Sequence, residues 1–306
     1  MDSHRGAEFD VTGLGENSLD RVFSVETFPV AGGKVELEDL GSRPGGQVAT
    51  TVLGCTRLGL RSAYLGVVGR DSEAEAVLAP LREAGVDLEG VLRRGGARTR
   101  TATLLVRAED GERSVLVSRD PGLNASGDEF STRTWMRSRL LHLDATDPDL
   151  ALWVSEQAHE AGVPVTLDLD AVVPGVERIL ERARFPVVSR SFAQAWGGED
   201  DVGAGLRRMA RTEACRLAVA TCEADGAMAI FEDQLVHVPA FFVAVRDSTG
   251  AGDAFRSGFI WALLQGQGVE EVLRTAQAVA ALSCRAVGAQ AGLPDQVELQ
   301  AFLSSA

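Results

Sequence analysis

The sequence predicts an α/β protein, with a three-layer α/β/α domain on a mostly parallel central sheet and a small β-sheet attached. Short apolar segments, "RLLHLD", "VPVTLD", "FPVVS" and "CRLAVAT", alternate with helical stretches after residue 138. This alternation is typical of a parallel sheet that helices cover on both faces. Residues 98–119 are instead rich in β-forming residues, and a length of 306 residues suffices for one large domain with a small addition.

The first hundred residues begin with "FDVTGLG", which predicts a strand that runs into a glycine turn. "PGGQVATTVLGCTRLG" predicts a helix that follows two glycines and ends at Gly59, because its apolar residues recur at helical spacing. "RSAYLGVVG" indicates one buried strand. "DSEAEAVLAPLREAG" indicates a helix that Asp71 or Ser72 caps and that stops at Gly85.

Two separated segments predict the small sheet. Residues 16–45 are mixed and polar with a turn signal at 29–33, and in 97–120 the segments "RTRTATLLVR" and "RSVLVSR" flank Asp110-Gly111, a strong hairpin signal. We expect these segments to form a β-sheet lid, and residues 1–15, 46–96 and 121–306 to form the large domain.

The C-terminal third predicts a second hairpin, a strand and two helices. "GAMAIFEDQLVHV" turns at Asp233, and "FFVAVRD" reads as a strand that leads into "DSTGAGDAFRSG". The two last helices carry the apolar residues from Phe255 to Leu263 and the alanine-rich "TAQAVAALSCRAVG".

Composition and charge exclude several classes of protein. A net charge of −14 without a basic stripe argues against nucleic acid as a partner. No apolar run reaches the length of a membrane span, so no membrane is expected. The polar N-terminus carries no secretory signal and the four cysteines form no Cys-x-x-Cys unit, so we expect free thiols and a cytoplasmic protein.

The segment "STGAGD" carries the most specific chemistry. Gly250, Ala251 and Gly252 leave backbone N–H groups free to converge at the start of a helix, where negative charge is stabilised. Such a turn suits a transferring phosphoryl group. Asp253 beside it would repel phosphate unless it had its own role, and accepting the proton of an attacking hydroxyl is that role. The alternative is that Asp253 merely caps the helix.

The chain resembles the ribokinase, or PfkB-type, family of carbohydrate kinases along nearly its whole length. "GLGENSLDRV", "PGGQVATTVLGCTRLG", "LGVVGRD", "DSTGAGDAF" and "AVGAQAGLP" match family segments in the family's order. The resemblance implies a ribokinase-like fold with a β lid, ATP and Mg²⁺ as cofactors, and a sugar as acceptor. It also implies K⁺ as a further cofactor, and a homodimer that pairs through the lid.

The resemblance also implies roles for individual residues. Asp253 matches the catalytic base, and the three residues before it match the anion hole. Asp20, beside Asn17, matches an acid that grips two sugar hydroxyls. Gly45 and Gly46 match the hinge at which the lid closes. Thr221, Gly226 and the helix that ends near Cys284 match the nucleotide site, and Asp247 and Thr249 match a monovalent-cation site. Asp144 falls at the end of a strand, where ligands bind in α/β sheets, and is a candidate substrate contact.

Two departures from the family pattern stand out. Gln47 follows the two glycines, where Asn or Lys is usual, and we expect it to bind substrate. The family's Asn-x-x-Glu motif falls at "SRSF", which offers Ser189 for a polar contact but Phe192 in place of the carboxylate. In this departure the chain is similar to ketohexokinases, which also lack the usual motif. Metal organisation then falls to Asp168, Asp170 or Glu223, the last also a nucleotide-side residue, or to water.

Other function classes are weaker. "VTGLGENS" imitates a dinucleotide-binding motif but has Ser18 in place of the third glycine, and no Walker A motif is present. A nucleoside acceptor would need aromatic rings, for which Phe23, Phe28 and Trp135 are the candidates. A sugar-binding sensor that kept the fold but lost turnover would explain "SRSF" but not Asp253. We therefore expect ATP-dependent phosphorylation of a small sugar.

Overall fold

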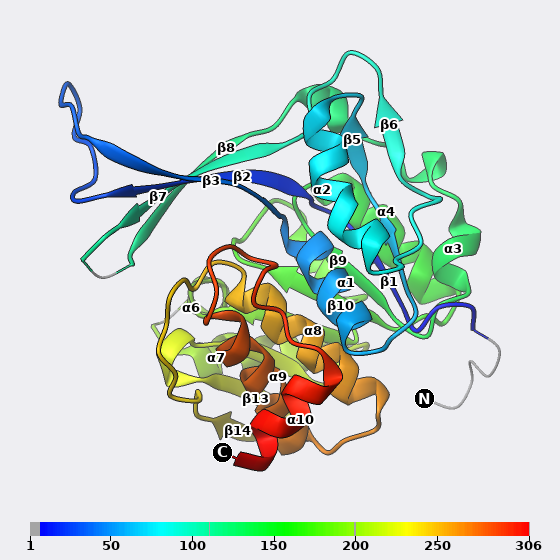
Figure 1. Cartoon of the computed structure of the whole chain (residues 1–306). Helices are drawn as coiled ribbons and strands as arrows, with labels where there is room; N and C mark the ends of the chain where they lie inside the picture. Colours follow the sequence, from blue (N-terminus) through cyan, green and yellow to red (C-terminus); the bar gives the residue numbers. More distant parts are fainter. Residues whose placement is uncertain (1–6, 110, 199, 306) are drawn as a thin grey trace.

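A single large sheet forms the centre of the molecule (Figure 1). The computed structural model describes residues 7–109, 111–198 and 200–305. In spatial order the sheet's strands are β14 (Gln234–Val238), β13 (Ala227–Phe231), β12 (Ala218–Thr221), β11 (Phe185–Ser189), β10 (Val165–Leu169), β9 (Leu141–Asp144), β1 (Val11–Leu14) and β4 (Ser62–Leu65). The strands from β4 to β12 run parallel, and the β13–β14 hairpin extends the sheet antiparallel.

Helices cover both faces of this sheet, which confirms the predicted three layers. One apolar core joins the sheet to α1 (Gln47–Arg57), α2 (Ser72–Glu83), α8 (Ala251–Leu264), α9 (Val269–Ser283) and α10 (Gln296–Ser305). The other joins it to α3 (Thr132–Met136), α4 (Pro148–Glu160), α5 (Val176–Leu180), α6 (Arg190–Gly197) and α7 (Val202–Ala210). Short 3₁₀ turns cover Pro121–Leu123, Gly127–Glu129 and Glu223–Asp225.

The central strands are apolar because they are buried on both faces. Every residue of β1, β4, β9 and β10 is buried, as parallel sheets between two helix layers require. His142 on β9 is fully buried, and burial lowers its pKa to about 3. It is therefore a neutral packing residue.

A second, four-stranded sheet projects from the large domain (Figure 1). Its strands are β3 (Leu37–Gly45), β2 (Ser18–Val25), β7 (Thr101–Arg107) and β8 (Arg113–Ser118), in that order. Both predicted β segments therefore contribute to one sheet. β7 and β8 pair antiparallel as expected for a hairpin, and Gly111 in the turn has a φ of 73°, while Asp110 lies outside the described residues. A small core of Val22, Ala102 and Leu104 fills one face.

Three sequence-based expectations were wrong in detail. The predicted strand over 61–69 is two strands, because β4 joins the large sheet and β5 (Val67–Gly69) pairs with β6 (Leu92–Arg94). Residues 241–247 form no strand: Arg246 and Asp247 donate their amides to the carbonyl of Cys284 instead of to a strand. The third C-terminal helix, α10, was missed because among its described residues Leu299 alone is fully packed.

The predicted cap of α2 and the predicted turn at Asp233 are confirmed. Asp71 caps α2 by accepting from the amide of Ala74, and the β13–β14 hairpin turns at Glu232 and Asp233, both with positive φ. Among the described residues, no helix combines the length and the apolar character needed to cross a membrane.

Candidate functional site

The carboxyl ends of the parallel strands open into a cavity of about 780 Å³. The N-terminus of α8, the end of α9 and the loops after β10, β11 and β12 enclose it. Parallel α/β sheets bind ligands at this edge. Many residues predicted from the sequence line it: Gln47, Asp170, Ser189, Thr221, Glu223, Gly226, Gly250, Ala251, Gly252, Asp253 and Cys284.

The glycine turn starts α8 as predicted. Gly250 is the N-cap residue with a φ of 76°, a left-handed conformation that favours glycine. A Cβ at this position would also come within 2.6 Å of the Ala289 side chain. The amides of the first helical turn therefore point outward at the cavity without side chains in the way.

Asp253 does not cap this helix, so the capping alternative was wrong. The N-cap position is Gly250, and no side chain accepts there. Asp253 stands in the first turn of α8 and lines the cavity. Burial raises the pKa of its carboxyl to about 8, helped by the nearby carboxylates of Asp170, Glu16 and Asp20, while the Arg256 guanidinium opposes the rise. A carboxyl with a pKa near neutrality suits proton transfer.

A buried polar cluster lies beside Asp253. Arg256 on α8 places Nη2 2.6 Å from Asp168 Oδ1 and 3.7 Å from Asp170 Oδ1. The Gln47 amide, at the start of α1, donates to Asp168 at 3.1 Å and to Asp170 at 2.7 Å. Sequence reasoning missed Arg256. The available signal was a lone arginine three residues after Asp253 in an otherwise apolar helix.

These aspartates do not form a metal centre by themselves. Across the described ranges, no group of three or more His, Cys, Asp or Glu side chains gathers as a metal site. Asp168 pairs with Arg256 and accepts from the Gln47 amide, and Asp170 accepts from the same amide, so these donors compete with a cation for the carboxylate oxygens. Within the described part of the chain, these aspartates therefore do not form a fitted Mg²⁺ cage.

The far side of the cavity holds the residues expected to face nucleotide. Ser189 caps α6 by accepting from the Phe192 amide, and its hydroxyl donates to the carbonyl of Asp170 at 3.2 Å. Glu223 pairs with Arg190 at 2.8 Å. Gly226 has a φ of 98°, and a Cβ there would lie 2.1 Å from the Val238 carbonyl. Phe241, Val245 and Ala280 add apolar walls that the sequence reading had not assigned.

Asp20 and the two glycines meet where the small sheet joins the large domain. Gly45 ends β3 beside Asp20 on β2, and a Cβ on Gly45 would lie 2.2 Å from Asp20 Oδ2. A Cβ on Gly46 would lie 2.3 Å from the Asn17 Cα. Ser18 donates to Asp20 at 2.6 Å, and burial raises the pKa of this carboxyl. Asn17 is buried and donates to Tyr64 at 2.7 Å.

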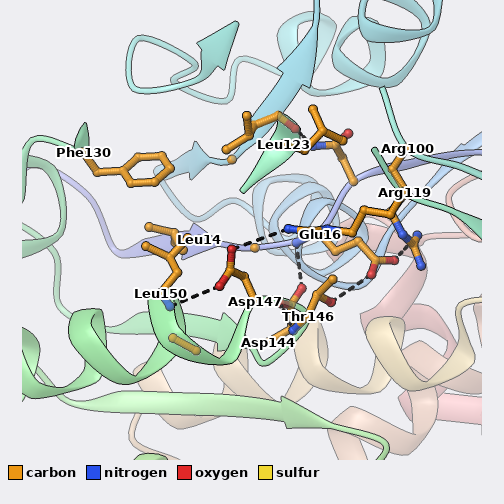
Figure 2. A pocket seen from close by; sticks show the side chains of 15 residues that line it. Leu14, Glu16, Arg100, Arg119, Leu123, Phe130, Asp144, Thr146, Asp147 and Leu150 are labelled. Carbon is orange, nitrogen blue, oxygen red and sulfur yellow. Dashed lines mark hydrogen bonds and ion pairs between the residues drawn. The ribbon is translucent and has the colours of Figure 1, made fainter. Parts of the chain in front are cut away.

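A smaller cavity of about 60 Å³ opens beside Asp144 (Figure 2). Asn17 also lines it. Asp144 ends β9 as predicted, but both of its oxygens accept backbone amides, from Glu16 at 2.7 Å and Thr146 at 3.0 Å. Glu16 in turn accepts from Thr146 and forms an ion pair with Arg100. Burial and the nearby Asp144 carboxylate raise the pKa of Glu16 to about 7, although Arg100 opposes the rise.

Asp247 and Thr249, predicted to hold a monovalent cation, lie in the loop before α8. Asp247 accepts from the amides of Thr249 and Gly288, each at 2.8 Å. The carboxylate thus ties the α8 loop to the loop after α9. The Thr249 hydroxyl is buried without a hydrogen-bond partner among the described residues.

Comparison with known protein families identifies the family of this chain. The model of the pfkB family carbohydrate kinases matches residues 10–296. The chain belongs to this family. The predicted resemblance and ribokinase-like fold are therefore confirmed, and the protein is an ATP-dependent kinase of the type that phosphorylates sugars or nucleosides.

Named relatives of this pfkB-family kinase act on different acceptors. It is 28% identical over 312 residues to the ATP-dependent ribose-1-phosphate kinase of Halopiger xanaduensis, covering 96% of this chain and 98% of that protein. It is 28% identical over 321 residues to fructokinase-1 of Oryza sativa, covering 97% and 98%. Its fold matches Arabidopsis thaliana ribokinase complexed with ribose and ATP, with a TM-score of 0.82 at 20% identity, over 96% of this chain and 98% of that one.

Proposed function

We propose that this kinase transfers the γ-phosphoryl group of ATP to a hydroxyl of a small sugar. The observation that carries the proposal is the position of Asp253 in the first turn of α8, directly after the glycine turn. The carboxylate there lines the large cavity and feels the charges of Asp20 and Glu16 at the base of the small sheet. Phosphoryl transfer requires a base that lies between the bound phosphate and the acidic residues that hold the attacking hydroxyl.

In the proposed reaction, Asp253 takes the proton of the attacking hydroxyl. The sugar oxygen forms a bond to the γ-phosphorus as the bond from that phosphorus to the β–γ bridging oxygen breaks, and ADP leaves with the bonding electron pair. The amides of residues 250–253 stabilise the negative charge that develops on the transferred group. Mg²⁺ enters bound to the nucleotide, as part of the donor substrate.

We propose that Asp20 accepts hydrogen bonds from two sugar hydroxyls, since one carboxylate can accept several. Asn17, Gly45, Gly46, Gln47 and Asp144 would line or shape this acceptor site. Ser189, Thr221, Glu223, Gly226 and Cys284 would face the nucleotide, where all five line the cavity. Asp247 and Thr249 are proposed to bind K⁺. Measuring the kinase activity with and without K⁺ in the buffer tests this assignment.

The small sheet, residues 16–45 and 97–120, is proposed as a lid over the acceptor site. Closure would exclude water, which otherwise competes as a phosphoryl acceptor. Arg113 at the start of β8 donates to the Ser248 hydroxyl at 2.8 Å, so the lid already contacts the loop before α8. Deleting residues 111–117 removes this contact. We expect the deletion to increase ATP hydrolysis relative to sugar phosphorylation.

The direct test is ATP consumption across sugars, sugar acids, sugar phosphates and nucleosides. We expect one class to be turned over, and Asp253→Asn to lower the rate by about 10²–10⁴ because it removes a positioned base. Asp149→Asn is the matched control, since Asp149 also stands in the first turn of a helix, is exposed and lines neither cavity. Equal rates in the parent and Asp253→Asn would refute the mechanism. Sugar binding without any phosphorylation would indicate a sensor.

A further inference from the structure

A buried arginine, Arg256, lies beneath the cavity one turn after Asp253. Its side chain is 2% exposed, and that of its partner Asp168 is fully buried. Residues three apart on a helix share a face, and both Asp253 and Arg256 line the cavity. Burying a charge is costly, and a buried ion pair can often be replaced by apolar residues without loss of stability. The fold alone therefore gives no reason for an arginine at this position.

The guanidinium is fixed from three sides. Nη2 meets Asp168 and donates to the carbonyl of Val187 on β11 at 3.3 Å. Nη1 lies under the glycine turn, since a Cβ on Gly252 would come within 2.8 Å of it. Gln47, at the start of α1, donates hydrogen bonds to Asp168 and Asp170. The positive charge is thus anchored between β10, β11 and the turn that precedes Asp253.

The charges that face this region are mostly negative. Asp168 lies on β10 and Asp170 directly follows it, Glu16 lies between β1 and β2, Asp20 lies on β2, and Asp144 ends β9. The neighbouring helices α1 and α9 add the uncharged Gln47 and Gln277 to the lining. His142 is buried and neutral, and Arg100 is engaged by Glu16. Of the two arginines that line the cavity, Arg113 comes from the small sheet and Arg256 lies on the helix of Asp253.

We propose that Arg256 is a positioning residue of the kinase: anchored by Asp168 and Asp170, it is the internal counterion that lets Asp253 carry a negative charge among these carboxylates. The proposal rests on the proposed role of Asp253 as the base. The charge balance around Asp253 agrees with it, because Arg256 is the principal neighbour that lowers the pKa of this carboxyl while Asp170, Glu16 and Asp20 raise it. Without Arg256, ionised Asp253 would be scarcer at neutral pH.

The test compares Arg256→Met, Arg256→Lys and Asp170→Asn with the parent, by pH profiles of kcat/KM and by NMR titration of the Asp253 carboxyl in protein made with isotope-labelled aspartate. Arg256→Met keeps the length of the stem but not the charge. We expect its acidic limb to move up by about one pH unit or more, with an about tenfold loss of kcat/KM near pH 7 that recovers at higher pH. Arg256→Lys retains the charge and should stay near the parent profile.

Asp170→Asn should move the limb in the opposite direction, to lower pH, because it removes a negative neighbour of Asp253. Asp170 is exposed, so this variant keeps the test decisive if Arg256→Met does not fold. Arg207→Met, an exposed arginine on α7, is the matched control and should leave the profile unchanged.

Three results would overturn the proposal: a profile of Arg256→Met that superposes on the parent after scaling, an equal shift in Arg256→Lys, or no opposite shift in Asp170→Asn. Failure of the proposed function has a different signature. A parent that phosphorylates nothing in the acceptor panel refutes the function, while the NMR titration of Asp253 still decides whether Arg256 sets its ionisation.

Discussion

At the scale of single residues, burial decides the chemistry of this kinase. Several carboxylates lie at the candidate site, and the sequence alone assigns all of them ordinary acidity. In the structure, burial raises the pKa of Asp253 to about 8 and that of Glu16 to about 7. The surroundings of the two carboxyls differ, since Asp253 lines the cavity and Glu16 forms an ion pair with Arg100, yet burial raises the pKa of both.

The raised pKa of Asp253 predicts an effect on stability. A carboxyl whose folded pKa lies above its unfolded value stabilises the fold fully at low pH, and this contribution is lost as the pH rises from about 4 through about 8. Asp253→Asn never carries the buried charge. Its melting temperature should therefore exceed that of the parent at about pH 9, by about 2–4 °C for each kcal/mol, and the gap should narrow towards pH 5.

Thermal unfolding followed by circular dichroism at several pH values measures this difference. Asp149→Asn, at an exposed position, should show no such trend. A constant offset between Asp253→Asn and the parent at all pH values would contradict the raised pKa.

At the scale of elements, Gly46 sets where α1 begins. Gly46 is the N-cap residue of α1 with a φ of 94°, and the Asn17 backbone fills the place where a Cβ would stand. This contact holds the β1–β2 junction against the start of the helix, so that Gln47 projects towards Asp168 and Asp170. The order of the site thus depends on the close approach of two backbones.

Gly46→Ala should therefore destabilise the protein more than the same substitution at a glycine that has positive φ but open space around it. Gly85 after α2 has a similar φ of 86° but open space where a Cβ would stand, so Gly85→Ala isolates the conformational cost of about 1–2 kcal/mol. We expect Gly46→Ala to exceed that value in urea unfolding and to weaken sugar binding. Equal losses of unfolding free energy in the two variants would show that the contact with Asn17 is relaxed at little cost.

At the scale of the whole molecule, the small sheet is the part that extends into solvent (Figure 1). Val115, Leu116 and Val117 of the edge strand β8 are 52–55% exposed. A single polypeptide gains nothing from apolar residues on an open edge, which promotes pairing with another chain. We propose that two copies pair through this sheet.

The proposed dimer is tested by light scattering coupled to gel filtration. We expect a mass of twice the 32.4 kDa chain, and a monomer for Leu116→Lys, because a buried lysine without a partner is unfavourable. Glu112, at the tip of the same hairpin, is not a suitable control because it pairs with Arg107. Arg207→Met, on α7 of the large domain, is a suitable control and should leave the mass unchanged. A monomeric parent would refute pairing but leave the kinase assignment intact.

The sequence by itself determined the three layers, most of the central strands and helices in their order, and the glycine turn before Asp253. Those features depend on local patterns. Buried strands are continuously apolar, and an N-cap residue in the left-handed backbone conformation favours glycine. Tertiary structure alone decided that Arg256 meets Asp168, that Gln47 joins them, that Asp144 spends its oxygens on amides and that residues 241–247 wall a cavity rather than form a strand. These contacts join residues that are far apart in the chain, and their partners and burial exist only once the sheet has assembled.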